Sequence, residues 1–401
     1  MTFEELGLNA RMVSRLNAMG LTQPTPIQQQ AIPQALQGRD ILGIAQTGTG
    51  KTAAFGIPLV MALSRQPERA EPNTARGLVL APTRELATQI VRNLQRISAD
   101  LRVTLVVGGK SINAQAENLA RGTDILVATP GRLIDLMERR AVDLAKTRFL
   151  VLDEADQMLD IGFVHALRRI AAKLGKNRQT MMFSATMPKA MADLSRDYLS
   201  DPVWVEVSAP GKVAGKVTHS VHFVPQDQKQ DLLISLLDAH RDELALVFSR
   251  TKHGAERLMK QLERVGFAAT SIHGNKSQGQ RDRAIAAFKS GSVRILVATD
   301  VAARGIDIPG VAHVYNYDLP NVPENYVHRI GRTARAGKSG RAIAFCAADK
   351  VAELKAIEKV LGIPVEVAGG RPWASMAGGA KPQKKRQARR RASGRPERMA
   401  A

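Results

Sequence analysis

The chain has 401 residues, of which 44% are apolar, and this length and composition predict two or more domains with hydrophobic cores. Its net charge of +21 predicts a polyanionic partner, and its single cysteine, Cys346, excludes an intrachain disulfide. Because no apolar run is long enough to cross a bilayer and the N-terminus lacks the pattern of a signal peptide, we expect a cytoplasmic protein without membrane contacts.

Short apolar runs alternate with amphipathic stretches in both halves, an order typical of a parallel sheet covered by helices. The runs of the first half lie at residues 40–45, 78–81, 103–107, 125–128, 149–152 and 180–183. Those of the second half lie at 221–224, 245–248, 268–272, 294–298, 312–315 and 342–345. The pentapeptide Ile-Leu-Val-Ala-Thr occurs at 125–129 and again at 295–299. With the same order of elements around it, it favours duplication of one α/β lobe over a chance match between strands.

The composition divides the chain into four parts. We expect the first lobe at residues 1–205 and the second at 218–368. Residues 206–217 hold proline and glycine without periodicity and are predicted to be a linker. From residue 369 to 401 there are ten Lys and Arg against one Glu, in a segment poor in apolar residues, which predicts a disordered basic tail.

The spacing of histidines predicts no metal cluster. His219 and His222 lie three apart in a stretch that alternates like a strand, where their side chains would face opposite sides.

A glycine-rich segment follows the run at 40–45 and opens a helical stretch. Gly48, Thr49 and Gly50 let backbone N–H groups turn toward phosphates, Lys51 can reach the β- and γ-phosphates, and Thr52 can ligate Mg²⁺. The general pattern has Gly where Ala45 stands, so this is a variant of it. The alternative is a glycine-rich turn with an incidental lysine.

Two carboxylates follow the buried run at 149–152. In the pair Asp153 and Glu154, one carboxylate can hold Mg²⁺ through water, and its neighbour can act as a base toward an attacking water. A solvated acidic turn is the alternative for this segment alone.

An adenine site is predicted upstream. The amide of Gln28 can pair with a donor and an acceptor on adenine, and Phe3 offers a stacking face. The prolines before Gln28 are also consistent with a simple helix start.

Together these segments resemble the DEAD-box family of ATP-dependent RNA helicases over about residues 1–365, most of all its bacterial RhlE type. The motifs that carry the resemblance are Phe3 to Gln28, Ala45–Thr52, Pro82–Leu86, Gly108–Gly109, Thr129–Arg132, Asp153–Asp156, Ser184–Thr186, Val247–Ser249, Ala298–Asp307 and His328–Arg335. Gln280 and Arg283 fit the family's Gln-x-x-Arg, and Ala334 stands where the family usually has Gly. The resemblance implies two tandem RecA-like lobes, each a parallel sheet flanked by helices.

The resemblance also implies roles for individual residues. Lys51, Thr52 and Asp153 would hold the phosphates of ATP and Mg²⁺, and Glu154 would orient or deprotonate water. From the second lobe, Arg332 and Arg335 would act as arginine fingers, for which surface charge at a helix end is the alternative. Asp307 would contact the ribose. Ser184, Thr186 and His328 would connect the ATP site to the RNA site. The RNA backbone would be contacted by Arg84, Gly109, Thr129, Arg132 and Thr299.

The expected activity is RNA-stimulated ATP hydrolysis with local, non-processive unwinding of RNA. An ATP-gated RNA clamp with little unwinding is the alternative, and a DNA helicase or chromatin-type ATPase is a third. Backbone contacts imply binding without sequence preference. We expect a monomer, since nothing in the sequence argues for an oligomer, and the family suggests ribosome-assembly or RNA-decay partners. The tail is expected to tether RNA, with an idle solvated tail and a targeting signal as alternatives.

Overall fold

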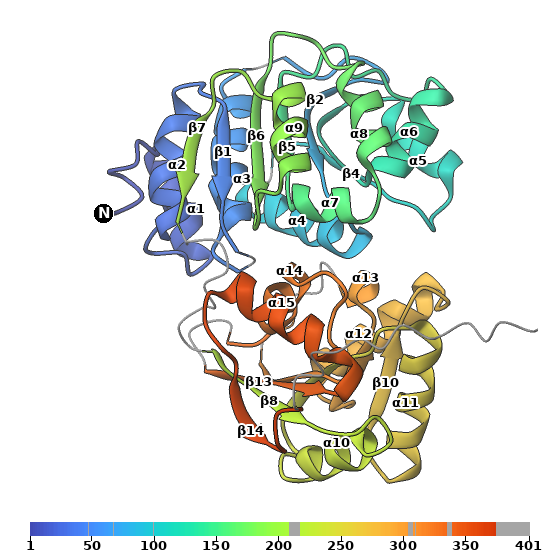
Figure 1. Ribbon diagram of the computed structural model, residues 1–401. Helices are drawn as coiled ribbons and strands as arrows, with labels where there is room; N and C mark the ends of the chain where they lie inside the picture. The colour runs from blue at the N-terminus through green and yellow to red at the C-terminus, as the bar shows by residue number, and fades with distance from the viewer. Residues whose placement is uncertain are drawn as a thin grey trace, which may run out of the picture.

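The computed structural model describes residues 1–46, 48–66, 68–98, 100–207, 217–303, 308, 310–334 and 339–373. These residues form two lobes, lobe 1 (residues 1–207) and lobe 2 (residues 217–373), each built on a seven-stranded sheet. All strand pairings in both sheets are parallel. Figure 1 shows lobe 1, in blue to green, above lobe 2, in yellow-green to red, with helices covering each sheet.

The elements alternate between strand and helix along each lobe. Lobe 1 contains α1 (Ala10–Ala18), α2 (Pro26–Leu36), β1 (Ile41–Ile44), α3 (Lys51–Ser64), β2 (Ala75–Leu80), α4 (Arg84–Ile97), β3 (Val103–Val106), α5 (Ile112–Leu119), β4 (Thr123–Ala128), α6 (Pro130–Glu138), β5 (Phe149–Leu152), α7 (Ala155–Asp160), α8 (Val164–Ala171), β6 (Gln179–Ser184), α9 (Lys189–Tyr198) and β7 (Val203–Glu206). Lobe 2 contains β8 (Val217–Phe223), α10 (Lys229–Asp238), β9 (Leu244–Phe248), α11 (Lys252–Arg264), β10 (Ala269–Ile272), α12 (Gln278–Ser290), β11 (Ile295–Ala298), α13 (Asp300–Ala303), β12 (Val311–Asn316), α14 (Glu324–Ile330), β13 (Gly340–Cys346), a 3₁₀ turn (Ala348–Lys350), α15 (Val351–Leu361) and β14 (Glu366–Gly369).

The two sheets have the same strand order. It is β3-β4-β2-β5-β6-β1-β7 in lobe 1 and β10-β11-β9-β12-β13-β8-β14 in lobe 2, so each strand of lobe 1 corresponds to the strand seven places later. The repeated pentapeptide starts within β4 and at the first residue of β11, which correspond in this order. The shared topology therefore supports duplication of one lobe.

Burial explains why the central strands are apolar throughout. Helices pack on both faces of a parallel sheet, so β1, β5 and β11 have no face left for polar side chains. The helices need only one apolar stripe. In α4 it consists of Leu86, Ala87, Ile90, Val91, Leu94 and Ile97, at the spacing of a helix face. Cys346 is buried and free.

The boundaries differ from expectation at the edge strands. β7 and β14 were not expected; both are short strands at sheet edges, where Trp204 and Val367 are exposed. β14 extends to Gly369, and the Trp373 Nε1 donates a hydrogen bond to the carbonyl of Cys346 at 3.0 Å. Ordered structure thus continues past the expected start of the tail at residue 369.

The rest of the expected tail, from residue 374, lies outside the described residues, as does the expected linker between 208 and 216. Among the helices that the structure describes, none has both the length and the apolar character needed to cross a membrane.

A candidate nucleotide and nucleic-acid site between the lobes

The loop before α3 has the backbone shape of a phosphate-binding turn. Gly48 and Gly50 have φ values of 89° and 94°, which favour glycine. Gln28 braces this loop: its Nε2 donates to the Gly50 carbonyl at 3.1 Å, and its Oε1 accepts from the Thr25 amide at 3.0 Å. A Cβ on Gly50 would lie 2.5 Å from the Gln28 Nε2, so the brace also requires glycine there. The free amides at the start of α3 are left facing the cleft.

A cavity of about 280 Å³ opens in front of this loop. Its lining includes Gly48, Gly50, Lys51 and Thr52 from the loop, Asp153 and Glu154 from the end of β5, and Arg332 from lobe 2. The Lys51 Nζ lies 3.9 Å from Asp153 Oδ1, and both atoms are buried without a hydrogen-bond partner among the described residues. Buried polar atoms that lack partners are costly, so this arrangement suits a site filled by an anion and a cation.

Burial raises the pKa of the Asp153 carboxyl to about 6, although the nearby Lys51 ammonium opposes this shift. The neighbouring Glu154 carboxylate raises it further. Glu154 itself is 2% exposed and has a φ of 52°, a left-handed conformation that costs a non-glycine residue roughly 1–3 kcal/mol. Strain of this kind occurs where the fold must hold a side chain in one functional position.

Arg332 brings lobe 2 into the cavity. It follows α14, is 5% exposed, and lines the same space as Lys51 and Glu154. Its burial there favours the arginine-finger interpretation over surface charge. Arg335 and Asp307 lie outside the described residues, so their expected roles stay predictions.

The expected stacking role of Phe3 stays a prediction, and its position in this structure does not support it. Phe3 is 2% exposed and packs in the core of lobe 1 with residues such as Leu6 and Leu16, and it is not part of the cavity lining. Gln28 does line the cavity, and its amide keeps one N–H and one lone pair beyond its two hydrogen bonds. The apolar side of the cavity is instead formed by residues that include Met19 and Leu21, which the sequence did not single out.

Asp156 connects the cavity to lobe 2, a role that the sequence did not reveal. Its Oδ2 accepts hydrogen bonds from the amides of Ala185 and Thr186, at 3.1 and 3.0 Å, and from Thr186 Oγ1 at 2.9 Å. The same oxygen lies 3.8 Å from the His328 Nε2 of lobe 2. Ser184 completes the turn by donating its hydroxyl to the Thr186 carbonyl at 2.7 Å. Of the expected coupling residues, Thr186 and His328 therefore lie at one carboxylate, and Ser184 is bonded to Thr186.

A second hollow, of about 370 Å³, lies beside the first lobe's other motifs. Arg84, Gly109, Thr129 and Arg132 all line it, together with Val301 of lobe 2. Gly109 is needed for close packing, because a Cβ there would lie 2.0 Å from an Arg84 nitrogen. Thr299 is not part of this lining; it follows β11, where its amide donates to the Ile272 carbonyl at 3.3 Å.

Gln280 and Arg283 were assigned to the family's Gln-x-x-Arg, but another pair at the same spacing contacts lobe 1. Gln280 caps α12 in a capping box with Ser277, and Arg283 is exposed. Residues two positions earlier in the chain form the contact. Gln278 Oε1 accepts from Arg84 Nη1 at 3.1 Å, and Arg281 Nη2 lies 2.9 Å from Glu85 Oε1. The Gln-x-x-Arg pattern therefore belongs to Gln278 and Arg281.

Family models match both lobes. Residues 25–194 match the DEAD/DEAH box helicase family, and residues 228–337 match the helicase conserved C-terminal domain. The chain belongs to the DEAD-box helicase family. Curated relatives include the ATP-dependent RNA helicase CshA of Listeria monocytogenes, 43% identical over 89% of this chain and 68% of that protein. CshA of Bacillus subtilis is 44% identical over 89% of this chain and 72% of its own. The narrower resemblance to the RhlE type stays a prediction.

Two solved structures share the arrangement of the two lobes, and a third differs. Saccharomyces cerevisiae Dbp5 bound to RNA and ADP BeF3 has a TM-score of 0.81 at 33% identity, over 92% of this chain and 95% of its own. Mss116p bound to ssRNA and AMP-PNP has a TM-score of 0.83 at 28% identity, over 93% and 80%. A DEAD box protein from Methanococcus jannaschii, 35% identical over 92% and 99%, reaches only 0.52. A lower TM-score at equal coverage is expected when two structures have the same lobes in a different relative orientation. The lobes of this chain are therefore arranged as in Dbp5 and Mss116p.

Proposed function

We propose that this DEAD-box chain is an ATP-dependent RNA helicase that hydrolyses ATP between its lobes and locally separates short RNA duplexes. The observation that carries the proposal is the shared cavity. Arg332 of lobe 2 lines the same space as the lobe-1 residues Lys51, Asp153 and Glu154. A complete ATP site therefore requires the closed arrangement of the lobes, and the hollow beside Arg84 is completed by the same arrangement.

The cavity residues fit ATP with Mg²⁺, since a buried ammonium and a buried carboxylate both lack hydrogen-bond partners there. Thr52 and Asp153 would hold Mg²⁺, largely through water, and the cation would neutralise charge on the phosphates. Lys51 binds the β- and γ-phosphates, and the glycine loop donates backbone N–H groups to them. Glu154 orients and deprotonates the attacking water, while Arg332 stabilises the charge that develops on the transferred phosphoryl group. Gln28 contacts adenine, and Met19 and Leu21 form the apolar wall beside it.

Nucleotide and RNA binding are coupled through lobe closure. A ligand that prefers the closed state favours binding of the other by the same factor. Asp156 and His328 provide a contact that exists only when the lobes meet, and the 3.8 Å pair lies between the two sites. We infer that ATP turnover opens the lobes and releases one strand.

RNA would contact Arg84, Gly109, Thr129 and Arg132 through its sugar–phosphate backbone, with Thr299 nearby in lobe 2. Such contacts carry no sequence information, and they make affinity steeply salt-dependent. The same proposal includes Arg335 as a second arginine finger, Asp307 at the ribose, a basic tail that tethers RNA, and a cytoplasmic monomer with ribosome-assembly or RNA-decay partners.

Unwinding and clamping are distinguished by strand release. We expect a short RNA duplex with a single-stranded overhang to be separated under multiple turnover with ATP. The non-hydrolysable analogue AMP-PNP should support RNA binding without turnover. Stable RNA binding with both nucleotides and no strand release would favour the clamp alternative.

The raised pKa of Asp153 predicts pH-dependent binding of Mg²⁺ with ADP. The pKa of this carboxyl is about 6 in the folded chain, against an ordinary value of 3.8. Without ligand, the folded chain therefore loses stability as the pH rises toward 6 and the carboxyl ionises. A cation requires the ionised form, so its affinity should fall about tenfold per pH unit below pH 6. Fluorescent ADP titrations with and without Mg²⁺, from pH 5 to 8, measure this.

Asp153→Asn is the control that separates titration of the carboxyl from titration of the ADP phosphates. The phosphates are the same in both experiments, and only the carboxyl is missing from the variant. The variant should bind Mg²⁺ with ADP weakly at all pH values. The same pH dependence in parent and variant would show that Asp153 does not bind the cation.

The contact between Glu85 and Arg281 predicts a second effect. Their side chains are 10% and 17% exposed, so this pair is partly desolvated and should be coupled by about 1–3 kcal/mol. Arg281→Ala should raise the RNA concentration needed for half-maximal ATPase stimulation about tenfold, because closure loses a contact between the lobes. A double-mutant cycle with Glu85→Ala measures the coupling between the two residues. Its readout is the RNA concentration for half-maximal ATPase stimulation in the parent, the two single variants and the double variant.

Arg283→Ala is the matched control, since it removes an exposed arginine from the same helix. It should change the half-maximal RNA concentration less than threefold. Equal effects of the two arginine variants would mean that general charge, and not the contact between the lobes, is responsible.

A further inference from the structure

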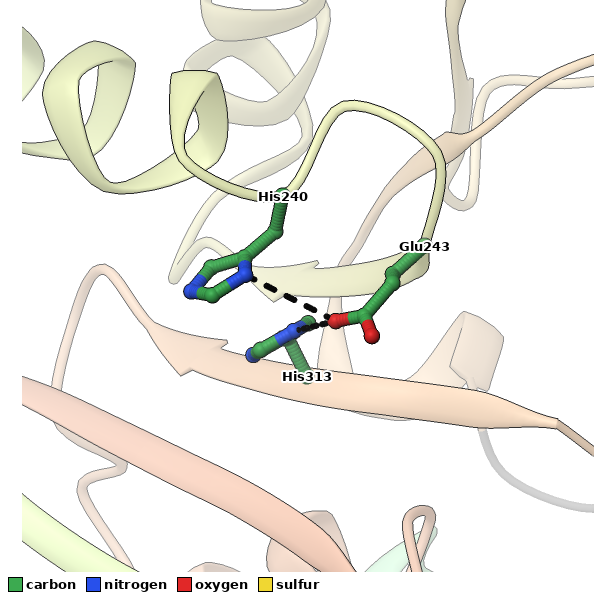
Figure 2. Close-up of side chains that lie close together, drawn as sticks. All are labelled: His240, Glu243 and His313. Atoms are coloured by element: carbon green, nitrogen blue, oxygen red, sulfur yellow. Dashed lines mark hydrogen bonds and ion pairs between the residues drawn. The ribbon is translucent and has the colours of Figure 1, made fainter.

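Three side chains from two segments of lobe 2 meet at the edge of its sheet opposite the nucleotide cavity. His240 and Glu243 lie in the turn between α10 and β9, and His313 is the third residue of β12. They stand at the amino ends of their strands, whereas Arg332 enters the cavity from α14, beyond the carboxyl end of β12. Figure 2 shows the two imidazole rings and the carboxylate facing one another.

The donor atoms converge on one point. The Nδ1 of His240 lies 3.7 Å from Glu243 Oε2, and the Nε2 of His313 hydrogen-bonds to that same oxygen. One donor atom from each of the three residues lies within 4.8 Å of the others. In a tetrahedral zinc site with bonds of about 2.0–2.2 Å, donor atoms are roughly 3.4 Å apart. A movement of the carboxylate, together with a rotation of the partly exposed His240 ring, would bring all three into that range.

We propose that His240, Glu243 and His313 bind one divalent transition-metal cation, with Zn²⁺ the best match, and that the cation fastens the α10–β9 turn to β12. Two imidazoles and one carboxylate are a donor set that zinc uses, and water would complete the coordination. The site lies apart from the ATP cavity, so its role is to stabilise lobe 2.

The surroundings prepare the histidines for this role. His313 is 4% exposed, and its ring stacks between His240, at 4.2 Å between centroids, and Tyr315, at 6.1 Å. Glu243 is 52% exposed, so its carboxylate is free to move away from His313 and admit the cation.

Two features limit the expected affinity. The Nδ1 of His313 has no hydrogen-bond partner in the described part of the chain, and a partner behind a metal-bound imidazole is commonly worth 10–100-fold. Arg341 lies opposite His313 on β13 and contributes positive charge. We therefore expect a dissociation constant on the order of micromolar.

Cobalt binding to the full-length chain tests the proposal. The protein is stripped with EDTA and saturated with Mg²⁺ and ADP to occupy the nucleotide site. It is then titrated with Co²⁺, followed by visible absorption, and with competing Zn²⁺. We expect one equivalent of Co²⁺, displaced by Zn²⁺, and a rise of a few degrees in the Tm of lobe 2 with Zn²⁺.

His240→Asn and Glu243→Gln test the assignment. Both side chains lie at least partly exposed, so these variants should fold, and each should weaken Co²⁺ binding at least about tenfold and remove the Tm shift. His253→Asn, an exposed histidine on α11, is the matched control and should bind like the parent. Equal binding by the parent and both variants, or no binding up to about 1 mM Co²⁺, would overturn the proposal. The cluster would then be only a hydrogen-bonded His–Glu pair.

Discussion

Replacing Glu154 by glutamine is expected to lower RNA-stimulated ATP hydrolysis at least a hundredfold while leaving ATP affinity nearly unchanged. The carboxylate lies at the end of β5 in the cavity that holds Lys51 and Asp153, and it is held there by a strained backbone. Glutamine has the same shape but cannot accept the proton of the attacking water. General-base catalysis contributes about 10²–10⁴-fold. The comparison is kcat from steady-state hydrolysis beside the dissociation constant of a fluorescent ATP analogue.

Glu117→Gln makes the same chemical change at an exposed position of α5 and should retain the parent kcat. If Glu154→Gln keeps more than a third of the parent kcat, the base lies elsewhere. If it loses ATP binding as well, the effect is structural, and the assignment of Glu154 as the base is not supported.

Arg332→Lys should lower kcat by a hundredfold or more, with a smaller effect on ATP affinity. The guanidinium enters the cavity from lobe 2, and an arginine finger contributes about 10³–10⁵-fold to phosphoryl transfer. Lysine keeps the charge but loses the planar fork of donors that matches phosphate oxygens. Single-turnover hydrolysis at saturating RNA measures the chemical step directly.

The exposed Arg264 of α11 provides the matched control, and Arg264→Lys should leave the single-turnover rate unchanged. RNA binding in the presence of AMP-PNP should remain within about threefold for both variants, because lobe closure does not depend on the chemical step. Normal hydrolysis by Arg332→Lys would mean that its charge alone suffices, or that the arginine does not act on the phosphates.

The central strands could be predicted from the sequence because their burial on both faces requires continuous apolar runs. The edge strands β7 and β14 could not, since one face and one edge of each are open and Trp204 and Val367 are exposed. Lys51 and Asp153 were located by their position after a strand, where α/β folds place their sites. The local sequence pattern thus identifies residues whose position is set by the end of a strand or by a glycine turn.

Residues positioned by long-range packing were less predictable. An aromatic residue near the N-terminus can face a ligand or the core, and only the packing of α1 and α2 shows that Phe3 is buried. The sequence alone could have excluded Gln280 from the Gln-x-x-Arg pair. Ser277, three residues before it, forms with it the signature of a capping box. The contacts of Asp156 to His328, and of Glu243 to His313, join segments far apart in the chain, and no spacing reveals them.

Steady-state ATP hydrolysis without nucleic acid, with single-stranded RNA and with DNA of matched sequence tests the coupling of the two sites most directly, using Glu154→Gln as the blank. A site completed only when the lobes close around both ligands predicts stimulation of at least tenfold by RNA. The resemblance to RNA helicases predicts little stimulation by DNA. Equal rates in all three conditions would contradict the account, because the ATP site would then be complete without the RNA groove.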